Sequence, residues 1–67
     1  MKKLQLNLDR LRAEMKRDNL TYEGLGRLMH STRQAVGYYF KNPDKLTLKT
    51  VARIAKALNM DPKDLLI

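Results

Sequence analysis

The stretch 21–40 constrains the fold of this 67-residue chain more than any other part of the sequence. It holds two short runs of helix-forming residues with a break of only a few residues between them. Thr21 and Thr32 stand just before these runs, where a threonine hydroxyl can accept a hydrogen bond from a free backbone N–H of the first helical turn. The apolar residues are spaced three and four apart: Leu25, Leu28 and Met29, then Val36, Tyr39 and Phe40. The stretch predicts two short helices joined by a tight turn at His30 and Ser31.

Helical patterns also occupy most of the remaining chain. A first helix is predicted from about Leu8 to Arg17, with Asn7 as its N-cap. The clearest amphipathic pattern follows Thr47, its expected N-cap, and its apolar positions are Leu48, Val51, Ile54, Ala55 and Leu58. Asn59 is expected to end that helix in a left-handed conformation, and Asp61-Pro62 to open a short fifth helix. Strand signals are weak, so residues 1–67 are expected to form one all-α, five-helix domain.

Composition excludes several classes of function. The chain has no cysteine and a single histidine, so thiolate or multi-histidine metal sites and disulfides are not expected. Neither a nucleophile–histidine arrangement nor a Gly-rich phosphate loop occurs, and we expect neither an enzyme nor a cofactor. No apolar run is long enough to cross a bilayer, and no export signal is recognisable. The sequence thus predicts a cytoplasmic protein without a membrane partner.

The charge of the chain predicts a polyanionic partner. Fourteen basic and seven acidic residues give a formal net charge of +7 and a pI of about 10.1, with the excess spread along the chain. A folded basic domain of this kind commonly binds nucleic acid. Arg33 and Gln34 begin the second helix of the 21–40 stretch, and these residue types read guanine and adenine edges in a major groove. The alternative for Arg33 and Gln34 is that they form a solvated first helical turn without a binding role.

Other residues support the same hypothesis less strongly. Gly37 and Tyr38 lie one turn further along the predicted helix, on the side away from the apolar residues. Gly37 is expected to let the helix approach DNA closely, or else is a tolerated helix defect. Tyr38 is expected to contact a thymine methyl group or a phosphate, or to be an exposed aromatic side chain at the edge of the core.

Several motifs resemble the lambda-repressor-like (Xre/Cro/C1-type) helix-turn-helix family. The resemblance covers about Leu8 to Leu66, and the residues that carry it are Leu20-Thr21, Leu25-Gly26, Met29, Thr32, Val36-Gly37, Phe40, the run 51–58, and 61–66. It implies a five-helix DNA-binding domain with its helix-turn-helix at about 21–40. It also implies a sequence-specific regulator of transcription, in particular a repressor, that reads the major groove of double-stranded DNA with the helix starting at Thr32.

The sequence departs from the family pattern at four positions. Tyr39 replaces a usual isoleucine or leucine, so its hydroxyl is expected to reach solvent or a partner. Tyr22 stands where the family usually has glutamine, and its hydroxyl can still donate one hydrogen bond to a phosphate. Gly26 replaces a usual alanine and is expected to allow close packing. His30 replaces the usual turn glycine, which implies a histidine with positive φ.

The resemblance also implies contacts with the DNA backbone and with a second subunit. The expected backbone contacts are Tyr22, Thr32, Lys41, Asn42 and Lys45, with Arg12 and Arg27 as weaker candidates. Lys2 and Lys3 are expected to form either a short basic arm or a solvated terminus. Leu65, Leu66 and Ile67 are expected to supply the contact of a homodimer that binds a pseudo-palindromic operator.

Three alternatives stay open at this point. The first is an antitoxin or phage accessory protein that uses this fold chiefly to bind a protein partner. The second is a nonspecific binder of polyanions or membrane surfaces. The third possibility is that the chain is the amino-terminal piece of a longer repressor.

Overall fold

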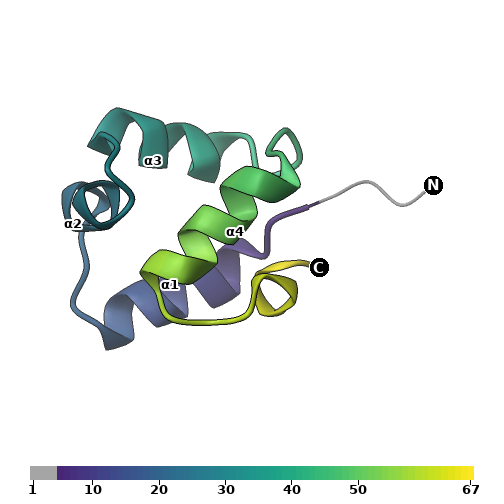
Figure 1. Ribbon diagram of the computed structural model, residues 1–67, viewed down its shortest axis with the longest axis horizontal. Helices are drawn as coiled ribbons and strands as arrows, with labels where there is room; N and C mark the ends of the chain where they lie inside the picture. The colour runs from purple at the N-terminus through teal and green to yellow at the C-terminus, as the bar shows by residue number, and fades with distance from the viewer. Residues whose placement is uncertain (1–4) are drawn as a thin grey trace.

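A computed structural model of the protein describes residues 5–67. Within this range the chain forms four α-helices and one 3-10 helix: α1 (Leu8–Arg17), α2 (Tyr22–Leu28), α3 (Arg33–Lys41), α4 (Leu48–Ala57) and η1 (Pro62–Leu65). Figure 1 shows α4 crossing the molecule diagonally in front of α1, with α3 along the upper edge and α2 beside the start of α3. The all-α fold predicted from the sequence is confirmed.

The predicted N-caps determine where the α-helices begin. The side-chain oxygens of Asn7, Thr21, Thr32 and Thr47 each accept a hydrogen bond from the backbone N–H three residues later, over 3.0–3.2 Å. Each such cap satisfies one of the N–H groups that have no partner inside the helix, and stabilises the fold by about 1 kcal/mol. All four predicted caps are therefore confirmed.

Three helices end at residues in the left-handed region. Asn19, His30 and Asn59 have φ angles of 55°, 56° and 56°. In each case the next residue donates its N–H back into the preceding helix: Leu20 to the carbonyl of Met15, Ser31 to that of Gly26, and Met60 to that of Ala55, over 2.7–2.9 Å. This is the hydrogen-bonding pattern of a helix end at which the chain reverses direction. The positive φ expected at His30 and the left-handed Asn59 are confirmed.

The core lies where α1, α2, α3, α4 and η1 meet, and it also includes Leu6 from the segment before α1 and Leu46 from the segment before α4. Its buried apolar side chains are Leu6, Leu11, Met15, Leu25, Met29, Val36, Phe40, Leu46, Val51, Ile54, Ala55, Leu58 and Leu65. Leu6 and Leu46 were not predicted as core residues, because each stands in a short segment without helical spacing. Leu48 belongs to the predicted apolar side of its helix but does not reach the core. It is the first residue of α4, and 60% of its surface is exposed.

The predicted fifth helix is a 3-10 helix of only four residues, η1. Asp61 caps it, because its carboxylate accepts the N–H of Lys63 over 3.1 Å, and Pro62 occupies the first turn as expected. The segment ends where Leu65 enters the core with no exposed surface. A further turn of α-helix does not form, since Leu66 adopts an extended conformation and pairs with another part of the chain.

That pairing joins the beginning and the end of the described chain. Leu6 and Leu66 form an isolated antiparallel bridge, in which Asn7 donates to the carbonyl of Leu65 over 2.7 Å and Ile67 to that of Gln5 over 3.0 Å. The N–H of Leu6 turns the other way and bonds the carbonyl of Pro43 over 2.9 Å. These bonds fix the start of α1 against both η1 and the loop that follows α3.

Candidate nucleic-acid interface

A close approach between backbones sets the angle between α2 and α3. Gly26 is buried in the last turn of α2, and a Cβ atom built on it would lie 2.9 Å from the carbonyl carbon of Thr32 and 3.0 Å from the carbonyl oxygen. Any side chain there would collide with the residue that caps α3. The expectation that Gly26 serves close packing is confirmed, and the packing partner is the turn itself.

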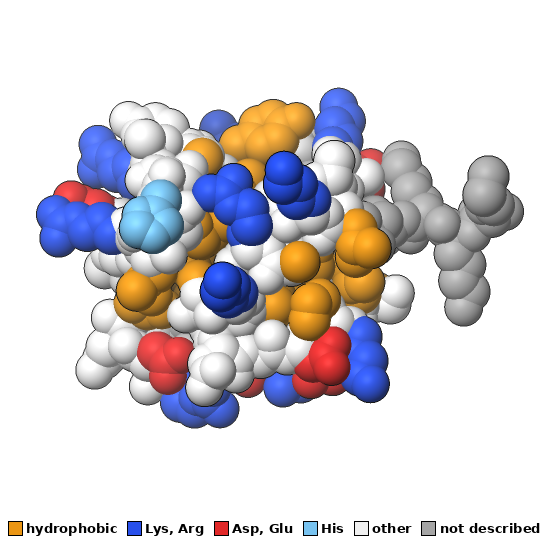
Figure 2. All heavy atoms as spheres, viewed as in Figure 1, with side chains coloured by type: hydrophobic (Ala, Val, Ile, Leu, Met, Phe, Trp, Pro, Cys, Tyr) orange, Lys and Arg blue, Asp and Glu red, His pale blue; other side chains and the backbone are white. Residues whose placement is uncertain are grey.

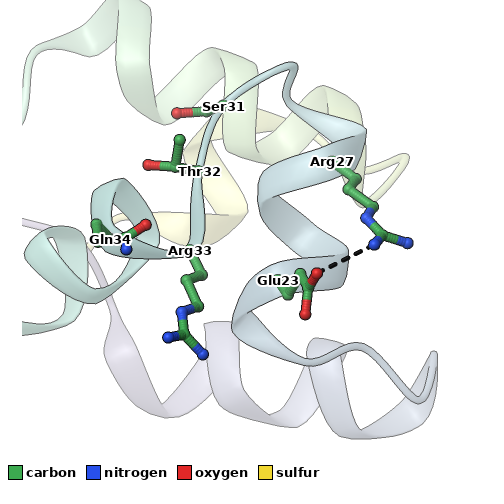
Figure 3. A pocket seen from close by; sticks show the side chains of 6 residues that line it. All are labelled: Glu23, Arg27, Ser31, Thr32, Arg33 and Gln34. Atoms are coloured by element: carbon green, nitrogen blue, oxygen red, sulfur yellow. Dashed lines mark hydrogen bonds and ion pairs between the residues drawn. The ribbon is translucent and has the colours of Figure 1, made fainter.

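The first turn of α3 faces solvent. Thr32, Arg33 and Gln34 are exposed, and no acidic residue occupies this turn. The free N–H groups of a helix amino end carry partial positive charge and favour an anion such as a phosphate. A hollow of about 390 Å³ lies beside this end, and it is lined by Glu23, Arg27, Ser31, Thr32, Arg33 and Gln34 (Figure 3). Arg33 and Gln34, which are expected to read bases, therefore line the same hollow as Thr32, which is expected to contact a phosphate.

Glu23 also lines this hollow, although it is not among the site residues predicted from the sequence. Its carboxylate accepts a hydrogen bond of 3.0 Å from the guanidinium of Arg27, one turn further along α2. Figure 3 shows the two side chains turned toward each other, while Arg33 extends from the start of α3 without meeting them. Arg27 is thus a weaker candidate for DNA contact than its charge suggests, because part of that charge is already neutralised. The spacing of four residues between an acid and an arginine was the signal available in the sequence.

The remainder of α3 presents a continuous outward side. Val36 is fully buried, whereas Tyr38 keeps 49% of its surface exposed. A second hollow, of about 360 Å³, is lined by Gln34, Gly37, Tyr38 and Lys41. A Cβ atom on Gly37 would meet nothing within 4 Å, so packing within the described residues does not require a glycine there. That Gly37 allows a close approach to DNA stays a prediction.

Tyr22 is held in place by an aromatic stack. Its ring stacks on that of Phe40, with 4.8 Å between centroids and 23° between planes. The guanidinium of Arg12 lies over the Phe40 ring, 5.3 Å from its centroid, in a cation–π arrangement. Phe40 of α3 thus orders one side chain from α2 and one from α1. Two expected backbone-contacting residues, Tyr22 and Arg12, are brought together by a core residue whose second role was not predicted.

The residues after α3 divide into exposed lysines and a helix cap. Lys41 and Lys45 are exposed, as a backbone clamp requires. Asn42 caps α3, because its backbone N–H and its side-chain amide both donate to the carbonyl of Tyr38, over 2.9 and 3.3 Å. Asn42 is half-buried, and its amide is therefore partly committed to the protein.

Arg53 of α4 supports the turn from behind. Its guanidinium donates a hydrogen bond of 2.6 Å to the carbonyl of Met29, at the end of α2. This contact was not predicted from the sequence, since a lysine or arginine on the polar side of a helix ordinarily points to solvent.

The burial of Leu65 corrects the prediction that Leu65, Leu66 and Ile67 together contact a second subunit. The Leu65 side chain is fully enclosed in the core and is not available to a second subunit, whereas Leu66 is half-buried and Ile67 is 78% exposed. The basic arm expected at Lys2 and Lys3 lies outside the described residues. Within residues 5–67, no helix is long and apolar enough to cross a membrane.

Comparison with known proteins decides the family. A helix-turn-helix family model matches residues 11–65, which is most of the chain. The chain belongs to the helix-turn-helix family. This is the Xre/Cro/C1-type, lambda-repressor-like domain that the motifs of the sequence indicated. Comparisons with curated proteins and with solved structures gave no match.

Membership in the helix-turn-helix family makes this a DNA-binding domain. Such families are generally not enzymes. The match begins inside α1 and ends at the last residue of η1, so it includes α2 and α3, the two helices that border the two hollows. The surface around α3 is accordingly the part of the molecule to examine as the DNA interface.

Proposed function

We propose that this helix-turn-helix protein is a sequence-specific regulator of transcription, acting as a repressor, that inserts α3 into the major groove of double-stranded DNA. One observation supports it above the others: the outward side of α3 carries polar, basic and small residues with no carboxylate, namely Arg33, Gln34, Gly37, Tyr38 and Lys41. Helices of this family's motif enter the major groove with their amino-terminal residues toward the bases.

The proposed base contacts follow from side-chain chemistry. Arg33 donates two hydrogen bonds to O6 and N7 of a guanine, and Gln34 pairs with N6 and N7 of an adenine. Both stand on the first turn of α3, where they reach furthest into a groove entered end-on. Tyr38 lies one turn later and contacts a thymine methyl group or a phosphate.

Phosphate contacts on either side of α3 fix its position. The first contact uses the N–H groups at the start of α3 beside Thr32. The Tyr22 hydroxyl and the Arg12 guanidinium, both packed on Phe40, also donate to a phosphate. The second uses the exposed lysines Lys41 and Lys45 at the other end of the helix. Backbone contacts at both ends would hold the helix along the groove without adding sequence preference.

We further propose that the protein binds a pseudo-palindromic operator as a homodimer. One module of this size offers few base contacts, and a two-fold dimer reads two half-sites about one helical turn apart. Leu66 and Ile67 supply the subunit contact, without Leu65. Sedimentation of the wild type and of Ile67→Asp on operator DNA tests this: the variant should bind as a monomer, and an unchanged two-to-one complex would exclude this contact.

Selection from a random duplex library tests the proposed base readout. The wild type is compared with Arg33→Ala and Gln34→Ala, and with Lys49→Ala as a matched control that removes an exposed side chain of α4 lining neither hollow. We expect a sequence motif that relaxes at one or two positions in each α3 variant and is unchanged in the control. Each lost contact should cost about 1–3 kcal/mol.

The opposite result has a clear meaning. A wild type that selects no motif, and whose DNA binding disappears as salt rises, would be a nonspecific binder or a domain that chiefly holds a protein partner. In the second case, DNA affinity would barely depend on Arg33.

A further inference from the structure

A groove on another side of the molecule is not explained by DNA binding. It lies between the end of α2 and the C-terminal half of α4, has a volume of about 430 Å³, and is lined by Leu28, Met29, His30, Arg53, Lys56 and Ala57. It shares no lining residue with the two hollows beside α3. Figure 2 shows basic side chains gathered over α4 on the visible face, with hydrophobic side chains between them.

The floor of this groove is apolar and partly open to water. Leu28 keeps 51% of its side chain exposed, although it is the last residue of a helix whose Leu25 is fully buried. Ala57 is half-buried on the facing helix. An apolar side chain placed between them would remove both surfaces from water, which is the main favourable term in most protein association.

The rim of the groove is basic, and no carboxylate lines it. Arg53 and Lys56 come from neighbouring turns of α4, and the Arg53 guanidinium is already fixed by its hydrogen bond of 2.6 Å to Met29. A guanidinium has five N–H donors, so this bond leaves others for a carboxylate. Because its orientation is set, Arg53 loses less conformational freedom on binding than a free side chain would.

The apolar floor argues against a nucleic-acid phosphate in this groove. A phosphate has no apolar group that could cover Leu28 and Ala57. A bare phosphate is better served by the amino end of α3. A ligand of this groove therefore needs apolar contact in addition to negative charge.

A second copy of the chain is also disfavoured as the occupant. In a two-fold contact across this rim, Arg53 and Lys56 of one copy would face the same cations of the other copy and repel them. We infer that the groove binds a short acidic segment of a protein partner, which inserts one apolar side chain between Leu28 and Ala57 and places carboxylates on Arg53 and Lys56. This inference does not depend on which DNA sequence the protein reads.

Peptide selection tests the inference without assuming a partner. A random twelve-residue peptide library displayed on phage is selected against the full chain, and the enriched peptides are synthesised and titrated into the isotopically labelled protein by NMR. We expect enriched peptides that combine an aliphatic or aromatic residue with two or more acids. Their binding should shift the amide signals of residues 28–30 and 53–57.

Two charge reversals on the same helix provide the decisive comparison. Lys56→Glu should weaken peptide binding by about tenfold or more, whereas Lys49→Glu, which changes the same charge outside the groove, should weaken it less than about twofold. Leu28→Ser should also weaken binding, and circular dichroism checks that each variant is folded. Enriched peptides without acids, signals shifted around α3 instead, or equal losses in the two lysine variants would each overturn the inference.

Discussion

Arg53 donates a hydrogen bond of 2.6 Å to the backbone carbonyl of Met29, joining residues that are 24 positions apart in the chain. Met29 is the C-cap of α2, and the next residue, His30, takes the left-handed conformation that redirects the chain toward α3. One side chain of α4 thus steadies the turn of the helix-turn-helix.

Removing that donor should loosen the turn. Arg53→Met keeps a side chain of similar length but leaves the Met29 carbonyl without its charged partner, and we expect the free energy of unfolding to fall by about 1–3 kcal/mol. Urea unfolding followed by circular dichroism measures it. Lys49→Met is the matched control, since it replaces an exposed basic residue of the same helix for which the structure shows no hydrogen bond. Equal stability of the two variants would mean that the Arg53 bond contributes nothing.

Two glycines should respond to alanine in opposite directions. At Gly26 the new methyl group would lie 2.9 Å from the backbone of Thr32. Overpacking of this kind costs about 1–3 kcal/mol, which exceeds the helix-propensity gain of up to about 1 kcal/mol. At Gly37 the methyl group meets nothing within 4 Å, and Gly37→Ala should stabilise the isolated protein by about 0.5–1 kcal/mol. Thermal unfolding of both variants checks this, and stabilisation by Gly26→Ala would contradict the close contact.

The ring of Tyr22 should contribute to stability, and its hydroxyl should contribute to DNA affinity. Tyr22→Phe keeps the stack on Phe40 and should leave stability within about 0.5 kcal/mol of the wild type. It removes the proposed donor to a phosphate, so DNA affinity should fall by about tenfold. Tyr22→Ala should lower both stability and affinity. Affinity of Tyr22→Phe equal to the wild type, measured by fluorescence anisotropy, would exclude the hydroxyl as a DNA contact.

The guanidinium of Arg12 should be visible in the salt dependence of DNA binding. Each phosphate neutralised by a cation adds about 0.9 to the slope of log affinity against log salt, so Arg12→Gln should lower the slope by about 1. Tyr22→Phe removes no charge and should leave the slope unchanged. A wild-type slope in Arg12→Gln would place Arg12 away from the DNA backbone.

The histidine in the turn should be replaceable with a gain in stability. His30 has a φ of 56°, a conformation that costs an ordinary L-residue roughly 1–2 kcal/mol and glycine almost nothing. His30→Gly should therefore raise the free energy of unfolding by about 1 kcal/mol, as measured by urea titration. Asn19→Gly, at a φ of 55°, is the comparison, because asparagine tolerates this region better and should gain less.

Local chemistry explains which elements were predictable. Asn7, Thr21, Thr32 and Thr47 each act on the backbone of the next turn, so sequence alone places the helix starts. The buried side of α4 was also predicted, except at Leu48. There the helical spacing continues but the first turn of the helix projects beyond the core, and periodicity does not reveal where a core ends.

Contacts between distant residues explain what was missed. The burial of Leu6 depends on Leu66 and Pro43, and no local pattern encodes that arrangement. In the candidate interface, the residue types on α3 were predictable because they follow from helical spacing. The Arg12–Phe40–Tyr22 stack was not, since it joins three helices whose relative positions a sequence does not state.

The bridge between Leu6 and Leu66 also bears on the order in which the domain is built. The turn between α2 and α3 closes a short loop and costs little chain entropy, whereas the bridge closes the long loop between residues 6 and 66. During synthesis the helix-turn-helix segment leaves the ribosome well before residue 66, so the segment ahead of α1 waits for a partner that is made later. We expect the DNA-facing helices to acquire their structure first, and the domain to reach full cooperativity only once residues 65–67 have emerged.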